Sequence, residues 1–294
     1  MFHVKQVEKS PIANNSLDLF LKCKDYIVSR ETFSIYIDKE TQLLITTPRP
    51  AVGDLSRYYD SEEYISHSNS KKSFIEKVYQ IVRNYTTKQK VKLINSFSTT
   101  NKSVLDIGSG TGDFLMACKQ NGWLIDGVEP NNNANKETRK KTFTEISKDI
   151  SELSNKQFDV ITMWHVLEHV PNLNEYISIL KNILKPDGVL VVAMPNHKSY
   201  DATYYKEFWA AYDVPRHLWH FSRLSIDKLF QLANMKVTKI LPMKFDAFYV
   251  SLLSEKYKTG KSNFLKAFFI GLRSNLKART SKEYSSLIYV IKNG

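Results

Sequence analysis

The chain has 294 residues, of which 42% are hydrophobic and 24% are charged. These fractions are those of a globular protein, and they exclude a wholly disordered or low-complexity chain. The two cysteines, Cys23 and Cys118, are too few for a disulfide framework or a four-thiolate zinc site. Residues 1–12 contain no apolar block of the kind that a signal peptide needs, and no apolar run reaches the roughly 18 residues of a membrane-spanning helix. We therefore expect a reducing, cytoplasmic location.

Positive charge gathers towards the C-terminal end. The formal charge is +12, and residues 246–294 contribute half of it, with nine basic and three acidic side chains. Bases between residues 256 and 282 are interleaved with an apolar stripe at helical spacing, made of Phe264, Leu265, Phe268, Phe269, Leu272 and Leu276. The simpler interpretation is a helix that packs this stripe on the body of the protein. The alternative is a surface that contacts an anionic lipid or substrate through residues 256–282. A nucleic-acid groove is not expected, because the other segments add little basic charge.

In chain order, apolar and polar side chains alternate over residues 25–50, which predicts two or three short strands. Over residues 54–95 the apolar side chains recur at helical spacing instead. We assign residues 1–95 to an N-terminal appendage of hairpin and helices. From residue 102 the pattern becomes strand, glycine turn, helix and strand. Strands are predicted at 104–107, 123–128, 158–162, 189–193, 237–241 and 286–291, and helices at 113–120 and 224–233. Alternating strands and helices predict an α/β fold with a doubly wound sheet covered on both faces.

The clearest functional signal is a glycine-rich turn after the predicted strand that ends at Ile107. Gly108, Gly110 and Gly112 precede a helix, and such a turn lets a ligand approach the backbone because no Cβ intervenes. The spacing departs from the G-x-G-x-x-G dinucleotide pattern. Glu129 ends the next strand, where a carboxylate can accept hydrogen bonds from both hydroxyls of a ribose. Together the two features favour an adenosine-containing cofactor.

On these motifs the chain resembles the class I S-adenosylmethionine-dependent methyltransferases. The matching segments are 104–112, 127–130, 158–161, 166–170 and 184–190, and Pro-Arg-His-Leu at 215–218 resembles a small-molecule subgroup. The resemblance implies a Rossmann-like seven-stranded sheet in the order 3-2-1-4-5-7-6 with the last strand antiparallel, over residues 96–294. It also implies S-adenosylmethionine as cofactor and S-adenosylhomocysteine as product. The basic helical stretch, about residues 243–284, would then be an insertion before the last strand.

The resemblance further implies roles for matched positions. Gly108 and Gly110 would lie against the methionine part of the cofactor, Asp106 would order the turn from beneath, and Glu129 would hold the ribose. Asp149 would accept the adenine amino group while the next N–H meets the ring, although Asp149 also suits a turn cap. The implied cofactor-binding set is Asp106, Gly108, Gly110, Gly112, Glu129, Asp149, Ile150 and Trp164.

Methyl transfer to a hydroxyl requires the removal of a proton, for which histidine is the usual side chain near neutral pH. His165 follows the fourth strand at the carboxyl edge of the sheet, so it is the first candidate for a base or substrate contact. The alternative is that it only flanks the cofactor. His217 is the second candidate, in an acceptor pocket whose aromatic walls would be Trp209, Tyr212 and Trp219; core packing is the alternative for each aromatic ring.

A possible metal-ligand pattern and a group of aromatic residues near the N-terminus are two further candidates for the site. His165-x-x-Glu168-His169 has metal-ligand spacing, and some quinone O-methyltransferases resemble it with a carboxylate in place of His165. We predict no metal, because Leu-Glu-His-Val is frequent in the family without one. Tyr58, Tyr59, Tyr64 and His67 either close over the cofactor or form an ordinary helix surface.

The sequence therefore predicts a methyltransferase that acts on a small molecule or a glycan- or lipid-linked acceptor, at a hydroxyl. The alternatives are an RNA or protein methyltransferase and a non-catalytic cofactor-binding scaffold. An amino-methylating nucleic-acid enzyme is disfavoured, because Met163-Trp164-His165-Val166 stands where an Asn-Pro-Pro-Tyr-like tetrapeptide would follow the fourth strand.

Overall fold

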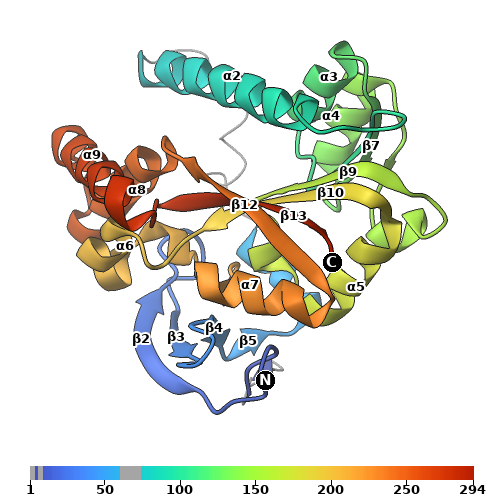
Figure 1. Ribbon diagram of the computed structural model, residues 1–294. Helices are drawn as coiled ribbons and strands as arrows, with labels where there is room; N and C mark the ends of the chain where they lie inside the picture. The colour runs from blue at the N-terminus through green and yellow to red at the C-terminus, as the bar shows by residue number, and fades with distance from the viewer. Residues whose placement is uncertain (1–3, 6–8, 60–73) are drawn as a thin grey trace.

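The computed structural model describes residues 4–5, 9–59 and 74–294, and its centre is one seven-stranded sheet in the order β12-β13-β10-β9-β6-β7-β8 (Figure 1). The strands of the central sheet are β6 (Ser103–Ile107), β7 (Leu124–Val128), β8 (Ile146–Ser147), β9 (Phe158–Trp164), β10 (Leu184–Pro195), β12 (Met235–Met243) and β13 (Ser286–Asn293). β13 runs antiparallel to both β10 and β12, whereas the pairs from β10 to β8 are parallel. The predicted Rossmann-like strand order is confirmed.

Helices cover both faces of this sheet (Figure 1). They are α2 (Phe74–Asn95), α3 (Asp113–Gln120) and α4 (Asn132–Thr142) on one face, and α5 (Leu173–Ile183) and α7 (Arg223–Leu232) on the other. Successive strand residues point to opposite faces, so Val104 packs under α2 and α3 while Leu105 packs towards α5 and α7. An apolar core therefore forms on each face of the sheet, and the strands are buried between the two cores.

No helix or strand is among the elements predicted between residues 130 and 157, and the structure places α4 and β8 there. Helix α4 is strongly polar, so it lacks the apolar periodicity by which helices are recognised. It begins where the Asn131 side chain accepts hydrogen bonds from the backbone N–H groups of Asn133 and Ala134. The cap and a few buried polar contacts position this helix, which explains why the hydrophobic pattern missed it.

The N-terminal segment forms a second sheet in the order β11-β4-β3-β2. Its strands are β2 (Asp18–Lys24), β3 (Thr32–Ile37), β4 (Leu44–Thr47) and β11 (Trp219–His220), and a separate pair joins β1 (Val4–Lys5) to β5 (Arg49–Pro50). The edge strand β11 comes from the C-terminal part of the chain, so the predicted appendage is completed by residues far along the sequence. The division at residue 95 stays a prediction, and this pairing crosses it.

Short helices carry the connections at the carboxyl edge of the central sheet. They are η1 (Val52–Tyr58), η3 (Ile150–Leu153), η4 (Leu167–His169), α6 (Tyr200–Tyr205), η5 (Lys206–Phe208) and η6 (Ala210–Tyr212). Segment 202–214 forms a third core with β2, β3 and β4, into which Trp209 and Tyr212 are buried. Trp219 is also buried, and its Nε1 donates to the Val170 carbonyl at 2.6 Å. Core packing therefore accounts for the three aromatic rings proposed as pocket walls.

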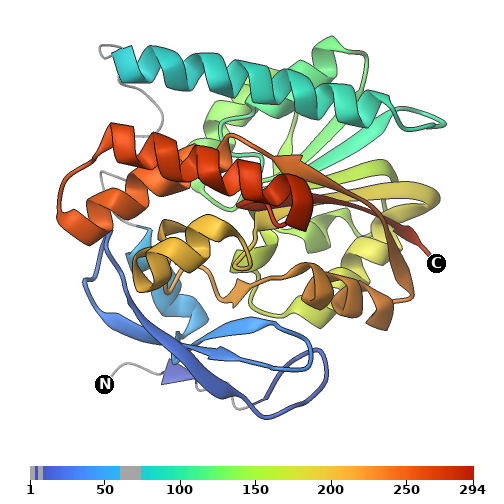
Figure 2. The same cartoon turned by 60° about the vertical axis from the view of Figure 1, so that its left-hand side comes forward.

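The expected helical insertion lies between β12 and β13 as α8 (Asp246–Thr259) and α9 (Phe264–Ser281), which pack side by side (Figure 2). The interpretation that the large apolar stripe of α9 packs on the protein is wrong. The buried face of α9 consists of Ala267, Ile270, Gly271, Ser274 and Ala278. A Cβ at Gly271 would lie 2.8 Å from Phe248 of α8, so the close helix contact requires small residues. The large side chains of α9, from Phe264 to Leu276, are left exposed.

None of the helices in the described part of the chain is both long enough and apolar enough to cross a membrane.

Asp159, at the start of β9, ties this strand to the entry of β6. Its carboxylate accepts hydrogen bonds from the backbone N–H groups of Thr100, Asn101 and Ser103 and lies 3.0 Å from the Lys185 ammonium. Burial alone would raise its pKa, but the hydrogen bonds from Ser103 and its other partners hold the pKa well below the usual range. A depressed pKa contributes stability above the unfolded value near 4, and that stability is lost as the pH falls below it.

Replacing Asp159 with asparagine is therefore expected to lower the free energy of unfolding by about 2–3 kcal/mol at neutral pH. The difference from the wild type should shrink as the pH falls from about 5 to 2, because the carboxylate of the unfolded wild-type chain then binds a proton that the folded chain does not bind. Urea unfolding at a series of pH values measures this. Asp187→Asn, at an exposed carboxylate, is the control. A difference that does not depend on pH would contradict the ionic account.

Candidate functional site

The glycine turn between β6 and α3 has the geometry that the sequence predicts. Gly108, Gly110 and Gly112 have φ values of +72°, +55° and +77°, a region that side chains disfavour. A Cβ at Gly108 would lie 2.5 Å from Val166, and one at Gly112 would lie 2.7 Å from Thr138. A Cβ at Gly110 would meet no described atom within 4 Å. Packing thus requires the outer two glycines, and the middle one opens the backbone to a ligand.

Glu129 lies at the edge of that opening. Its carboxylate accepts hydrogen bonds from the N–H groups of Gly110 at 2.8 Å and Asn131 at 2.9 Å. Each ionised carboxylate oxygen has two lone pairs, so acceptor capacity remains for two ligand hydroxyls. Burial raises the pKa of Glu129, and the two N–H groups lower it. The carboxylate that the sequence assigns to a ribose is therefore oriented by the glycine turn itself.

Asp106 lies beneath the turn, on β6, as predicted. It is buried, and its carboxylate accepts a hydrogen bond from the Thr162 hydroxyl at 2.6 Å. Burial raises the pKa of Asp106 to about 7, against the lowering effects of Thr162 and Lys90. The aspartate thus links β6 to β9 directly under the glycines.

Trp164 ends β9 beside this turn and packs edge-on against Phe114, with ring centroids 5.5 Å apart. The ammonium of Lys90, from α2, lies 4.3 Å from the centre of the indole ring. The buried indole N–H donates no hydrogen bond to the described residues. Sequence reasoning missed Lys90, because a lysine in a helical period carries no signal of the strand end it will face. Burial lowers the pKa of the Lys90 ammonium.

Asp149 and Ile150 follow β8. The Asp149 side chain accepts a hydrogen bond from the Ser151 N–H at 2.9 Å and caps η3, which matches the turn-cap alternative. Ile150 is buried in the core. The cap does not use every acceptor site of the carboxylate, so the adenine contact stays a proposal.

His165 is held between two carboxylates. Its Nε2 is 3.1 Å from Asp246, at the start of α8, and its Nδ1 is 3.4 Å from Glu168. Burial lowers its pKa, but hydrogen bonds with Asp246 and Glu168 outweigh burial and raise the pKa to about 10. His165 is then a cation at neutral pH, and a cation cannot accept a proton. The geometry therefore argues against the proposed base role and favours a positioning one.

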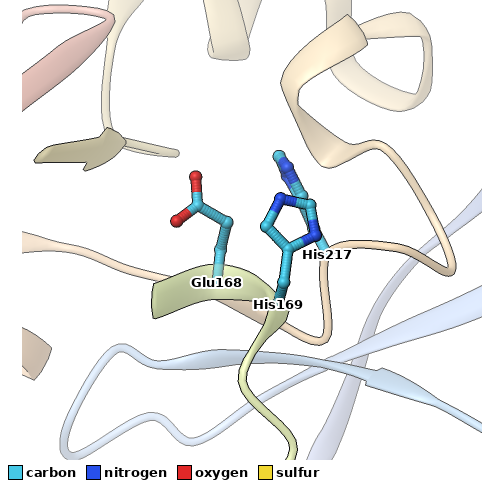
Figure 3. Close-up of side chains that lie close together, drawn as sticks. All are labelled: Glu168, His169 and His217. Carbon is cyan, nitrogen blue, oxygen red and sulfur yellow. The ribbon is translucent and has the colours of Figure 1, made fainter. Parts of the chain in front are cut away.

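Glu168, His169 and His217 form a second group of polar side chains near His165, in which Glu168 and His217 are buried and His169 is half-buried (Figure 3). Each offers one ligand atom, and these atoms lie within 4.8 Å of one another. The two imidazole rings meet edge to face with centroids 4.6 Å apart. The fold brings His217 to this point from 48 residues beyond His169 along the chain. The predicted candidate His217 thus lies beside Glu168 and His169, and His165 turns towards Asp246.

Arg216 fixes the loop that carries His217. Its guanidinium is 2.6 Å from Asp213 and 3.0 Å from Asp25, which directly follows β2, and it donates to the Tyr58 carbonyl of η1 at 2.9 Å. The side chain of Arg216 is fully buried. Arg216 therefore ties the loop that carries His217 to the N-terminal segment.

Of the four aromatic residues expected to close over the cofactor or to form a helix surface, Tyr58 and Tyr59 lie in the described part of the chain. Tyr58 is buried against Phe33, whereas the Tyr59 hydroxyl lies 3.1 Å from Nδ1 of His169. Tyr64 and His67 lie outside the described residues.

The sheet order, the glycine turn and the carboxylate at the end of the second strand define the class: a Rossmann-like protein of the methyltransferase type. The sequence profile described as a methyltransferase domain matches residues 79–240, more than half of the chain. The chain belongs to this family.

Individual relatives agree over shorter stretches. A ubiquinone biosynthesis O-methyltransferase from Glaesserella parasuis is 32% identical over 108 residues, which are 32% of this chain and 46% of that protein. A demethylmenaquinone methyltransferase from Tropheryma whipplei is 29% identical over 125 residues, 40% of this chain and 52% of that protein. The chain thus spans about half the length of the curated relatives it matches.

The fold also matches a solved structure. The magnesium protoporphyrin IX methyltransferase from Synechocystis PCC 6803, with S-adenosylhomocysteine bound, superposes with a TM-score of 0.52 at 16% identity. The match covers 81% of this chain and 97% of that one. At this identity the likeness shows the shared fold.

Proposed function

We propose that this chain transfers a methyl group from S-adenosylmethionine to a hydroxyl of a small molecule or of a glycan- or lipid-linked acceptor. The observation that carries the proposal is the coupling of Gly110 to Glu129, which places an oriented carboxylate beside an open stretch of backbone. The family supports it, and so do the names of two relatives, a ubiquinone biosynthesis O-methyltransferase and a demethylmenaquinone methyltransferase.

The residues of the turn fit the adenosyl cofactor. Glu129 would accept hydrogen bonds from the ribose hydroxyls, and Gly108 and Gly110 would lie against the methionine part. Trp164 would offer its ring and its free N–H to the adenosyl group, and Asp149 and Ile150 would meet the adenine. When bound, the cofactor supplies a methyl group on a positively charged sulfur, which is a strong electrophile.

The protein's task is then to place the acceptor oxygen in line and to accept its proton. A C–O bond forms as the C–S bond breaks, and the hydroxyl proton must leave. The cationic His165 does not suit that step. We assign the activation of the acceptor hydroxyl, which must lose its proton, to the cluster of Glu168, His169 and His217, which starts two residues after Val166, the residue in contact with Gly108.

Isothermal titration with S-adenosylmethionine, and separately with NAD⁺, tests the cofactor assignment. We expect saturable binding of S-adenosylmethionine and S-adenosylhomocysteine and none of NAD⁺. Failure of the wild-type chain to bind either adenosyl compound would overturn the proposal. Tight, salt-sensitive RNA binding would favour the RNA methyltransferase alternative instead.

The cytoplasmic location is part of the same proposal. The two cysteines, Cys23 and Cys118, are free and buried, as in proteins of reducing compartments. Burial raises the pKa of Cys23 to about 12, so this thiol is unreactive.

We further propose that the exposed stripe of α9 docks on anionic lipid. Leu265 is 75% exposed and Phe269 is 63% exposed, with Phe264, Phe268, Leu272 and Leu276 beside them. The same helix pair carries the bases Lys256, Lys258, Lys261, Lys266, Arg273, Lys277, Arg279 and Lys282. Apolar side chains that enter the interface and bases that meet anionic headgroups are the two parts of a peripheral membrane surface. An acceptor linked to lipid would be reached from such a surface.

The double variant Leu265→Ser, Phe269→Ser is expected to bind phosphatidylserine-containing vesicles at least about 10-fold more weakly, because each buried apolar side chain contributes about 1.5–3 kcal/mol. Cosedimentation with phosphatidylcholine vesicles, with and without phosphatidylserine, measures this. Leu232→Ser, at a 58% exposed leucine of α7, should leave binding unchanged. Equal binding by all three proteins would exclude α9 as the lipid surface.

A further inference from the structure

The Glu168, His169 and His217 cluster contains the donor atoms of a metal site. One atom from each side chain lies within 4.8 Å of the other two (Figure 3). Ligand atoms about 2.0–2.1 Å from a tetrahedral zinc ion are about 3.3 Å apart. The three side chains therefore need to close by no more than about 1.5 Å to share one ion.

The two imidazoles make their hydrogen bonds through Nδ1, and Nε2 of His217 has only a long contact of 3.9 Å with the Asp213 carboxylate. Nδ1 of His169 is 3.0 Å from the Arg216 carbonyl, and Nδ1 of His217 is 2.8 Å from the Ala211 carbonyl. A carbonyl only accepts, so each Nδ1 carries the proton and each Nε2 carries a lone pair. A backbone carbonyl behind the second ring nitrogen is the usual arrangement of a histidine that binds a metal.

The carboxylate of Glu168 keeps unused acceptor sites. Its side chain is 1% exposed, and its ion-pair partner in the described part of the chain is Nδ1 of His165 at 3.4 Å. An ionised carboxylate has about four acceptor sites, so this one contact leaves most of them unused. A bound cation would occupy these sites and would further stabilise the buried charge.

The surrounding structure holds the donors in place before any ligand arrives. The Leu218 N–H donates to the Glu168 carbonyl at 2.8 Å, which ties the His217 loop to η4. The His217 N–H donates to the Asp213 carbonyl at 3.0 Å, and Asp213 is itself bound by Arg216. The two segments that supply donors are therefore fixed to each other by backbone hydrogen bonds.

We propose that Glu168, His169 and His217 bind one divalent transition-metal ion of the zinc type. Two imidazole nitrogens and a carboxylate suit zinc, cobalt, iron or manganese, whereas magnesium and calcium prefer all-oxygen sites. This ligand set differs from the His165-x-x-Glu168-His169 pattern of the sequence, because His165 faces Asp246 and His217 takes its place.

Three protein ligands leave at least one coordination position open for the acceptor. Resting on the proposed function, the ion would bind the acceptor hydroxyl and lower its pKa, so that the oxygen reacts as an alkoxide or phenolate. The proton is released to solvent, and no redox change occurs. The ion thereby selects acceptors with a hydroxyl that can reach it, such as a phenol or catechol.

Titration of the metal-free full chain with Co²⁺, followed by visible absorbance, tests the site without any substrate. We expect one Co²⁺ per chain, displaced by Zn²⁺ and by chelator. The variants Glu168→Gln and His217→Gln should weaken binding at least about 100-fold, because changes to groups that merely support metal ligands already cost 10–100-fold. His197→Gln, at a buried histidine bonded to the Gln42 carbonyl at 2.9 Å, is the matched control.

Binding that survives Glu168→Gln and His217→Gln in chains with wild-type circular dichroism, or no Co²⁺ binding by the wild type, would overturn the metal site. S-adenosylmethionine titration of the same preparations separates this result from the proposed function. A chain that binds the cofactor but no Co²⁺ keeps the methyltransferase proposal and loses the metal. One that binds Co²⁺ but no cofactor keeps the metal site and loses the proposed function.

Discussion

Replacing Arg216 with methionine is expected to lower the free energy of unfolding by about 3–5 kcal/mol, the cost of removing one partner of a buried ion pair. The guanidinium lies between Asp25 and Asp213 and is fully buried, so methionine would leave two carboxylates without their counterion. The arginine also lowers the pKa of both carboxyl groups, although burial alone would raise it. Urea unfolding followed by circular dichroism measures the loss.

Arg223→Met provides the control, because Arg223 pairs with Glu283 at 3.5 Å with both side chains partly exposed. Exposed pairs contribute at most about 1 kcal/mol. If the two variants lost equal stability, the Arg216 network would be no more important than a surface pair. A second consequence follows from position, since Arg216 precedes His217 and joins its loop to Asp25 and Tyr58 of the N-terminal segment. Co²⁺ binding by Arg216→Met should therefore weaken as well.

Replacing Glu129 with alanine is expected to weaken S-adenosylmethionine binding by at least about 100-fold. Two hydrogen bonds from the ribose to an ionised carboxylate would be lost, each contributing about 1.5–3 kcal/mol, and each 1.4 kcal/mol is a factor of ten in affinity. The Gly110 and Asn131 N–H groups would lose their acceptor too, which loosens the glycine turn. Isothermal titration gives the affinity.

Glu145→Ala is the matched control for this variant, because Glu145 is exposed and pairs with Arg139 on the surface. It should bind the cofactor as the wild type does. Thermal unfolding of Glu129→Ala shows whether the chain remains folded at the titration temperature. An unchanged affinity in a folded Glu129→Ala chain would mean that another residue holds the ribose.

The fold was largely predictable, since its signals are local. Alternating apolar residues indicated the main strands, and the glycines after Ile107 indicated the turn, because a positive φ and a close approach restrict those positions to glycine. The pairing of Glu129 with this turn also follows from sequence, because strands β6 and β7 are neighbours in the chain and in the sheet. Helix α4 was missed because polar contacts, and no apolar face, hold it.

The remaining features of the site depend on contacts between distant segments. His165 was the first candidate for a base or a substrate contact, and α8 brings Asp246 to it from 81 residues away, which makes it a cation. Lys90 reaches Trp164 from α2 in the same way. Charge state is set by neighbours in space, which spacing along a chain does not give.

By itself, the sequence determined the α/β class and the glycine turn with its carboxylate, because each depends on residues close together in the chain. The strand order was implied by the resemblance to a family and did not follow from local signals. Only the tertiary structure decided which face of α9 is buried, since the small residues around Gly271 allow the close contact with α8 and leave the large ones outside. It also decided that His217 joins Glu168 and His169, because the backbone hydrogen bond from Leu218 to Glu168 brings two separate segments together.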